Sequence, residues 1–200
     1  MRTLATLRER DHRLTRRMAA WESPWARRLL PPVEEAAQRT KLWWAAAVLM
    51  AACGGGRGRR AAVAGITAMT VAELLSNGVA KQLVERRRPP EEWIPHDDVE
   101  DRPDSSSFPS GHTAAAVAFT AAVAPSWPPA GAACAVPAAL VAVERVHSGA
   151  HYPSDVAVGA AVGAMAAALV RKAPGLLARS APGLLARRVP GLPVRHRFRP

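Results

Sequence analysis

Three cations in two short polar segments have the types and spacing to hold a phosphate group. Lys81 and Arg88 are seven residues apart, so a helix would place them on one face, about 10.5 Å apart along its axis. Arg145 adds a planar guanidinium that suits bidentate contact with phosphate. We predict that these three side chains surround one anion. We interpret Arg86 and Arg87, beside them, as cations that point to the membrane surface.

A further polar segment, Pro-Ser-Gly-His at residues 109–112, stands directly before an apolar stretch. Ser110 and Gly111 are therefore expected where a helix begins. Free backbone N–H groups at a helix N-terminus, together with the helix dipole, favour phosphate oxygens. The absence of a side chain at Gly111 lets an anion approach the backbone. We predict that Ser110 and Gly111 belong to the same phosphate site.

Two histidines and a carboxylate supply groups for a double displacement at phosphorus. His151 and Asp155 are four residues apart, with Pro153 at a first helical position between them, so the carboxylate can reach the imidazole. A carboxylate that accepts one ring N–H leaves the other ring nitrogen free to attack, which makes His151 a candidate nucleophile. His112 can then supply the proton that the departing alkoxide needs.

The same region also has a spacing that is found in zinc sites. His147, His151 and Asp155 recur at four-residue intervals, and two such residues on one helical face can bind zinc. Gly149 and Pro153 interrupt the continuous helix that this would require. We therefore predict no metal site and no cofactor, and expect His147 in a loop or behind the site.

Apolar segments separate these motifs and must position them. They cover residues 42–56, 61–80, 108–124, 130–143 and 156–170. Several are shorter than the roughly 17 to 25 residues that cross a bilayer, but their Ala, Gly and Val content suits close helix packing in lipid. Counting the crossings places all three motifs on one membrane face. We predict an all-α, polytopic transmembrane helical bundle of about five spans. A soluble Ala-rich bundle is the alternative, but these segments mostly lack its polar stripe.

Basic segments flank the apolar core at both ends. In residues 1–40, Leu, Met and Trp recur at helical spacing among Arg residues, which predicts an amphipathic interfacial helix. Prolines 24, 31 and 32 interrupt this pattern, so a partly disordered basic arm is the alternative, and we assign no chemistry to either. Residues 41–172 are predicted to form the membrane-embedded phosphatase domain. Residues 173–200, with repeated Ala-Pro-Gly-Leu units, are predicted to be a flexible basic tail.

The formal net charge of +11 is compatible with binding to nucleic acid or to an anionic membrane surface. Apolar residues gather in blocks, and a nucleic-acid-binding protein would give those blocks no role. We therefore predict a membrane protein with no nucleic-acid partner.

In order and spacing, these motifs resemble the three-part signature of the type 2 phosphatidic acid phosphatase superfamily, KxxxxxxRP, PSGH and SRxxxxxHxxxD. The match runs from Lys81 to Asp155. The resemblance implies a lipid phosphatase that works without a metal, in which His151 forms a phosphohistidine, Asp155 orients it and His112 is the general acid. It implies phosphate binding by Lys81, Arg88, Ser110, Gly111 and Arg145. Soluble relatives hold vanadate and oxidise halides, but the apolar spans argue against that activity here.

One position departs from the signature. Glu144 stands where the third motif usually has Ser. A carboxylate cannot donate a hydrogen bond and would repel phosphate if it faced the site. We expect Glu144 to face away and pair locally. Lower activity, a changed substrate or a catalytically silent membrane scaffold are the alternatives. The acidic run at residues 91–104 is interpreted as a solvated connector, with a gate for head groups as its alternative.

Small bacterial members that resemble this chain act on isoprenoid lipids, including undecaprenyl diphosphate and decaprenylphosphoryl phosphoribose, or on phosphatidic acid and phosphatidylglycerol phosphate. We predict hydrolysis of a phosphomonoester or diphosphate of an isoprenoid lipid, with the glycerophospholipids as the alternative. Basic residues at 57–60 and 171–172 lie opposite the motifs, so the positive-inside rule predicts an extracytoplasmic site in a bacterial plasma membrane. The basic N-terminal arm favours the opposite orientation.

Overall fold

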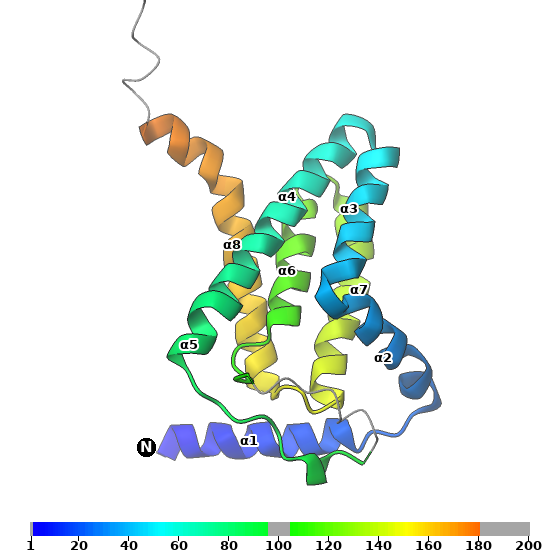
Figure 1. Cartoon of the computed structure of the whole chain (residues 1–200), viewed down its shortest axis with the longest axis vertical. Coiled ribbons are helices and arrows are strands. Elements are labelled where there is room, and N and C mark those ends of the chain that lie inside the picture. The colour runs from blue at the N-terminus through cyan, green and yellow to red at the C-terminus, as the bar shows by residue number, and fades with distance from the viewer. Residues whose placement is uncertain (1, 96–104, 181–200) are drawn as a thin grey trace, which may run out of the picture.

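The computed structural model describes residues 2–95 and 105–180, and every regular element within these two ranges is a helix. The longer helices are α1 (Arg2–Ala19), α2 (Pro24–Ala37), α3 (Lys41–Cys53), α4 (Gly55–Glu73), α6 (Gly111–Val123), α7 (Pro128–His147) and α8 (Pro153–Ser180). Shorter pieces are η1 (Gln38–Thr40), η2 (Leu74–Ala80), α5 (Lys81–Leu83) and η3 (Glu91–Trp93). Helices α3, α4, α6, α7 and α8 form a bundle, and α1 lies across one end of it (Figure 1). The predicted all-α bundle is confirmed.

Three stretches are long and apolar enough to cross a bilayer: Gly55–Leu83, Pro128–His147 and Pro153–Ala173. Helix α6 is apolar but shorter, and it packs against α4, α7 and α8. Ala116 and Phe119 of α6 are fully buried, as expected for a helix that is surrounded by protein. The chain is an integral membrane protein, and α6 is the central helix of its bundle.

Small residues let the helices approach closely. A Cβ atom built on Gly163 of α8 would lie 2.4 Å from the carbonyl oxygen of Ala114 in α6. A Cβ on Gly159 would lie 2.4 Å from the carbonyl oxygen of Ser110. No side chain fits in either place, so these glycines are what allows α8 to lie directly on α6.

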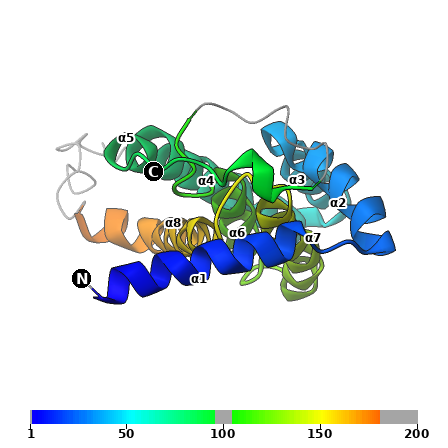
Figure 2. The same cartoon turned by 90° about the horizontal axis from the view of Figure 1, so that it is seen from below.

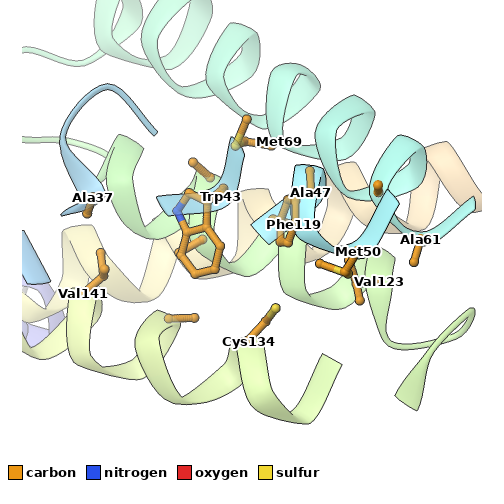
Figure 3. Packing of buried hydrophobic residues seen from close by; sticks show 14 residues of the cluster. Ala37, Trp43, Ala47, Met50, Ala61, Met69, Phe119, Val123, Cys134 and Val141 are labelled. Atoms are coloured by element: carbon orange, nitrogen blue, oxygen red, sulfur yellow. The ribbon is translucent and has the colours of Figure 1, made fainter. Parts of the chain in front are cut away.

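Larger side chains fill the other side of α6, between α3, α4 and α7. Figure 3 shows Trp43, Met69, Phe119 and Val141 within this cluster, and the ring centroids of Trp43 and Phe119 are 5.4 Å apart. Burying aromatic and aliphatic side chains of this size stabilises the bundle and fixes the rotation of α6. The N-terminus of α6 is thereby held at the end of the bundle that carries the three motifs.

The N-terminal arm is helical, and the alternative of a partly disordered arm is wrong for its described residues. Pro24 occupies the start of α2, where its missing N–H costs nothing, while Pro31 and Pro32 lie inside that helix without ending it. Helix α1 runs beneath the motif end of the bundle, as both views show (Figures 1 and 2). Arg39 and Thr40, between α2 and α3, have φ values of 50° and 57°, so a short left-handed turn joins the arm to the bundle.

The C-terminal boundary differs from the expected one. Helix α8 continues to Ser180, whereas we place the start of the tail at residue 173. The rest of that predicted tail, and the acidic run from residue 96 to residue 104, lie outside the described residues.

Candidate active site

A cavity of about 200 Å³ opens at the motif end of the bundle. Six of the eight predicted site residues line it: Lys81, Arg88, Gly111, His112, Arg145 and His151. They come from α5 and the segment after it, the first turn of α6, the last turn of α7 and the loop between α7 and α8. The structure thus brings three segments that are far apart in the sequence to one cavity. The other two predicted residues, Ser110 and Asp155, are fully buried and do not line it.

His151 is almost fully buried and its ring is held by the main chain. Its Nδ1 lies 2.5 Å from the carbonyl oxygen of Ser107. Because a carbonyl only accepts hydrogen bonds, Nδ1 carries the proton and Nε2 keeps its lone pair. Burial, followed by the charge of Arg88, lowers the pKa of His151 well below its ordinary value. The ring is therefore neutral near pH 7, as a nucleophile must be.

The carboxylate of Asp155 lies close to this ring, but at a longer distance than we expect from the sequence. Its Oδ2 is 3.9 Å from Nδ1 of His151 and accepts the backbone N–H of Tyr152 at 2.9 Å. The nearer acceptor for the imidazole is Ser107, which the sequence does not indicate because its carbonyl belongs to a loop. Asp155 therefore stands beside the imidazole as a buried negative charge, without a direct hydrogen bond to it.

Ser110 caps the helix that carries His112. Its hydroxyl accepts the N–H of Thr113 at 3.5 Å and lies 3.0 Å from the hydroxyl of that residue. Its backbone N–H donates to the carbonyl oxygen of Asp155 at 3.0 Å. The structure places Ser110 behind the cavity, where it joins the start of α6 to the start of α8.

Gly111 lies against a residue that sequence reasoning misses. A Cβ on Gly111 would be 2.8 Å from Oδ1 of Asn77, so no side chain fits between them. Asn77 belongs to η2, a π-helical stretch, and lines the cavity. Such stretches often occur at functional sites, but the regular apolar pattern of residues 61–80 gives no sign of one.

Two of the three predicted phosphate-binding cations, Arg88 and Arg145, are held by oxygen acceptors. Arg88 donates to the carbonyl oxygen of Ala150 at 2.7 Å, which ties it to the loop that carries His151. Arg145 is buried and pairs with two carboxylates, Glu144 beside it and Glu34 from α2. Glu144 is buried and does not line the cavity, so it faces away from it and pairs locally, as the sequence leads us to expect.

A model of the PAP2 superfamily matches residues 61–177, which is more than half of the chain. The chain belongs to the PAP2 superfamily. The resemblance seen in the three motifs is thereby confirmed. Decaprenylphosphoryl-5-phosphoribose phosphatase of Mycobacterium tuberculosis is 34% identical over 120 residues, 58% of this chain and 60% of that protein. The match spans less than two thirds of that relative's length.

Two solved structures have a similar fold. The first is a PAP2-type phosphatidylglycerolphosphate phosphatase from Bacillus subtilis, with a TM-score of 0.65 and 19% identity, covering 86% of this chain and 88% of that one. The second is LpxE of Aquifex aeolicus, with a TM-score of 0.62 and 22% identity, covering 80% and 93%. At these identities the likeness shows the fold, which is that of transmembrane PAP2 proteins.

The N-terminal arm lies outside the residues matched by the PAP2 model, yet it contributes to the cavity. Glu34, Arg39 and Thr40 all line it. Asp11 of α1 is buried beneath it and contacts Arg86 and Ser154. The sequence does not place this arm at the cavity, because none of its residues belongs to a motif. Arg86 does not point to the membrane surface either, because its guanidinium pairs with Asp11 and Asp155.

A signal for this arrangement exists in the sequence of α1. Asp11, Thr15 and Ala19 recur every four residues and form its buried stripe, whereas Leu7 and Leu14 are about half exposed. A stripe of small and polar residues beside leucines indicates a helix that packs on protein with one side and leaves its apolar side open. The exposed apolar side of α1 can contact the membrane surface, as the predicted amphipathic interfacial helix would.

Proposed function

We propose that this PAP2 protein is a membrane phosphatase that removes phosphate from an isoprenoid lipid through a phosphohistidine intermediate. One observation supports this function most directly. His151, His112 and three cations, from three separate motifs, line a single cavity. A cavity that combines a neutral nucleophile, a second imidazole and several cations suits transfer of a phosphoryl group.

In the proposed first step, the Nε2 lone pair of His151 attacks phosphorus while the bond from phosphorus to the leaving oxygen breaks. With the anionic substrate bound, which favours the charged imidazole, His112 carries a proton and gives it to that oxygen, so the alcohol leaves as a neutral molecule. The Nδ1–H bond to Ser107 and the nearby Asp155 carboxylate stabilise the positive charge that the ring gains. Lys81, Arg88 and Arg145 hold the phosphoryl oxygens throughout.

In the second step, water attacks phosphorus and the nitrogen–phosphorus bond breaks. His112 takes the proton from the water, inorganic phosphate leaves, and His151 returns to its neutral form. Both imidazoles then have the protonation states with which the cycle began.

Two carboxylates in the lining favour one class of isoprenoid substrate. Glu34 and Glu73 line the same cavity as the cations. The second phosphate of a diphosphate would add negative charge near them, whereas sugar hydroxyls donate hydrogen bonds to carboxylates. We therefore prefer a phosphosugar lipid of the decaprenylphosphoryl-phosphoribose type over undecaprenyl diphosphate. The name of the Mycobacterium tuberculosis relative supports the same choice.

Phosphate release by the detergent-purified protein, measured with EDTA present, tests this function. The substrates are decaprenylphosphoryl phosphoribose, undecaprenyl diphosphate, phosphatidic acid and phosphatidylglycerol phosphate. We expect release to be fastest from the phosphosugar lipid, to survive EDTA and to disappear in His151→Ala. Cys53→Ser, an exposed position outside the cavity lining, is the control and should behave as wild type.

Release from none of these lipids would contradict the proposed activity and would support the catalytically silent scaffold. Glu144→Ser, which restores the residue usual in the signature, is then the next protein to assay. Fastest release from a glycerophospholipid would keep the chemistry and overturn the substrate class.

We also propose that the protein lies in a bacterial plasma membrane with its cavity on the extracytoplasmic side. Arg57, Arg59 and Arg60, at the start of α4, lie at the end of the bundle remote from α1 (Figure 1). Arg171 and Lys172 follow the apolar part of α8 at that same end. Clusters of Arg and Lys next to spans favour the cytoplasmic side.

A further inference from the structure

Arg86 connects the N-terminal helix to the start of α8 through a buried set of hydrogen bonds. Its Nη1 donates to Oδ1 of Asp155 at 2.5 Å and to the hydroxyl of Ser154 at 2.7 Å. Its Nη2 donates to Oδ2 of Asp11 at 2.6 Å. Its Cζ lies 4.0 Å from the centroid of the Tyr152 ring. One guanidinium therefore contacts α1 and three residues next to His151.

Asp11 acts as a cap for α8 although it belongs to another helix. Its Oδ1 accepts the backbone N–H of Ser154 at 3.0 Å, and its Oδ2 accepts the hydroxyl of Ser154 at 2.5 Å. The N–H groups of a first helical turn have no partner within their own helix, and a carboxylate there also interacts favourably with the helix dipole. Asp11 is itself only 7% exposed, so α1 must be docked for this cap to form.

The charges of this network depend on one another. Asp155 is fully buried, and it forms an ion pair with Arg86, whose Nη1 lies 2.5 Å from Oδ1 of Asp155. A buried carboxylate that loses its counter-ion is strongly disfavoured in its charged form. Burial alone would lower the pKa of Arg86, but hydrogen bonds and charge from Asp11 and Asp155 raise it, so the guanidinium stays charged. Arg86 thus keeps Asp155 both ionised and correctly oriented beside His151.

We propose that Arg86 and Asp11 are positioning residues of the active site, and that α1 is a working part of it. Neither is a signature residue: Arg86 occupies a variable position of the first motif, and Asp11 lies outside the residues that the PAP2 model matches. They act through Asp155, whose negative charge lies 3.9 Å from the ring nitrogen of His151. They do not line the cavity, so we expect substrate binding by Lys81 and its neighbours to change little when they are replaced.

This role rests on the proposed function, and kinetics of matched variants test it. Arg86→Gln is compared with Arg87→Gln, which removes the same charge from the exposed neighbouring position. Asp11→Asn is compared with Glu9→Gln, which removes an exposed acid from the same helix. Loss of a group that orients a metal ligand lowers metal affinity or activity by roughly 10- to 100-fold, and we take the same range for a group that orients a reacting histidine.

We expect kcat to fall about 100-fold in Arg86→Gln and about 10-fold in Asp11→Asn, with KM within about two-fold of wild type. The rate of phosphohistidine formation in a single turnover should fall to the same extent. Asp11→Glu should recover part of the lost kcat, because a carboxylate is restored. Both controls should match wild type.

Two outcomes would overturn this role. In an active wild-type protein, kcat values within two-fold of the controls would show that the network does not act on His151. A rise in KM at unchanged kcat would place its effect on binding instead.

Hydrogen–deuterium exchange of residues 150–156 gives a readout that needs no turnover. We expect faster exchange at the start of α8 in Arg86→Gln and Asp11→Asn, and no change in either control. Unchanged exchange in both variants would overturn the proposed role even if the wild-type protein releases no phosphate. Wild-type inactivity together with faster exchange would instead contradict the proposed function alone.

Discussion

His151 is held in one tautomer by a backbone carbonyl, and a buried carboxylate stands behind it. The Ser107 carbonyl fixes which nitrogen carries the proton, while Asp155 supplies charge at 3.9 Å. These two tasks are often assigned to one carboxylate, but here two groups share them. A main-chain acceptor cannot be removed by a side-chain substitution, so the tautomer of His151 is insensitive to most changes in the sequence around it.

The lowered pKa of His151 has a consequence for stability at acidic pH. In the unfolded chain this histidine binds a proton near pH 6.5, whereas the folded protein, where burial and Arg88 lower the pKa, does not. The unfolded state therefore binds more protons as pH falls through 6.5, and stability decreases. We expect the melting temperature of His151→Asn to fall less than that of wild type when the pH is lowered from 7.5 to 5. Thermal unfolding in detergent checks this, and equal losses would contradict it.

The motif residues could be predicted at this scale because each group lies within a short stretch of chain. Spacing alone places Lys81 near Arg88, and His151 near Asp155. Arg86 could not be assigned, because its partner Asp11 is 75 residues away in the sequence. Glu34 and Arg145 are 111 residues apart. Contacts of this kind depend on how the arm folds back onto the bundle, which no local pattern reports.

At the scale of elements, the contact between α6 and α8 sets the geometry of the cavity. Helix α6 carries His112, and α8 begins directly after His151. Their axes can approach because Gly159 and Gly163 face carbonyl oxygens of α6 or of its cap. The two imidazoles are therefore placed by a backbone-to-backbone contact as much as by their own side-chain bonds.

Gly163→Ala should show how tightly the two helices fit. The added Cβ would meet the Ala114 carbonyl at 2.4 Å, so the backbone of one helix must move. We expect a loss of about 1–3 kcal/mol of stability, the usual cost of overpacking, measured as a lower melting temperature in detergent. Gly56→Ala, where an added Cβ meets nothing within 4 Å, is the control. A melting temperature equal to that of the control would mean that α8 is free to shift.

The five apolar segments could be predicted because small apolar residues between polar connections are a local pattern. The predicted segments at residues 42–56 and 108–124 agree closely with α3 and α6. The stretch that begins with α4 runs on through η2 to Leu83, beyond the predicted end at residue 80. Asn77 of its π-helical part lines the cavity and lies against Gly111 at the start of α6, a contact that no local pattern predicts.

For the whole molecule, the distribution of charge along the bundle bears on its orientation. The basic N-terminal arm is on the same end as the cavity, whereas Arg57 and Lys172 lie at the other end. Asp11 and Glu34 of the arm are paired with buried arginines. The arm is thus packed on the bundle and partly paired with it. We therefore let the basic residues at the opposite end decide the orientation under the positive-inside rule.

We expect a reporter tag placed after residue 200 to be reachable only from the cytoplasm. Helix α8 starts beside the cavity and runs to the opposite end of the bundle (Figure 1), so a cytoplasmic C-terminus corresponds to an extracytoplasmic cavity. Protease accessibility of the tag in intact cells, compared with lysed cells, measures this. A tag that is cleaved in intact cells would reverse the orientation and leave the proposed chemistry unchanged.

The cavity is assembled from two stretches of the gene. The codons for Glu34, Arg39 and Thr40 lie ahead of the region that the PAP2 model matches, and the codons for His112 and His151 lie within it. Recombination that exchanges the codons for residues 1–40 therefore replaces three lining residues together with Asp11 and leaves every motif residue in place. An inherited exchange of this kind would alter the walls of the cavity and, through Asp11, the surroundings of His151, while every motif residue passes to the descendant unchanged.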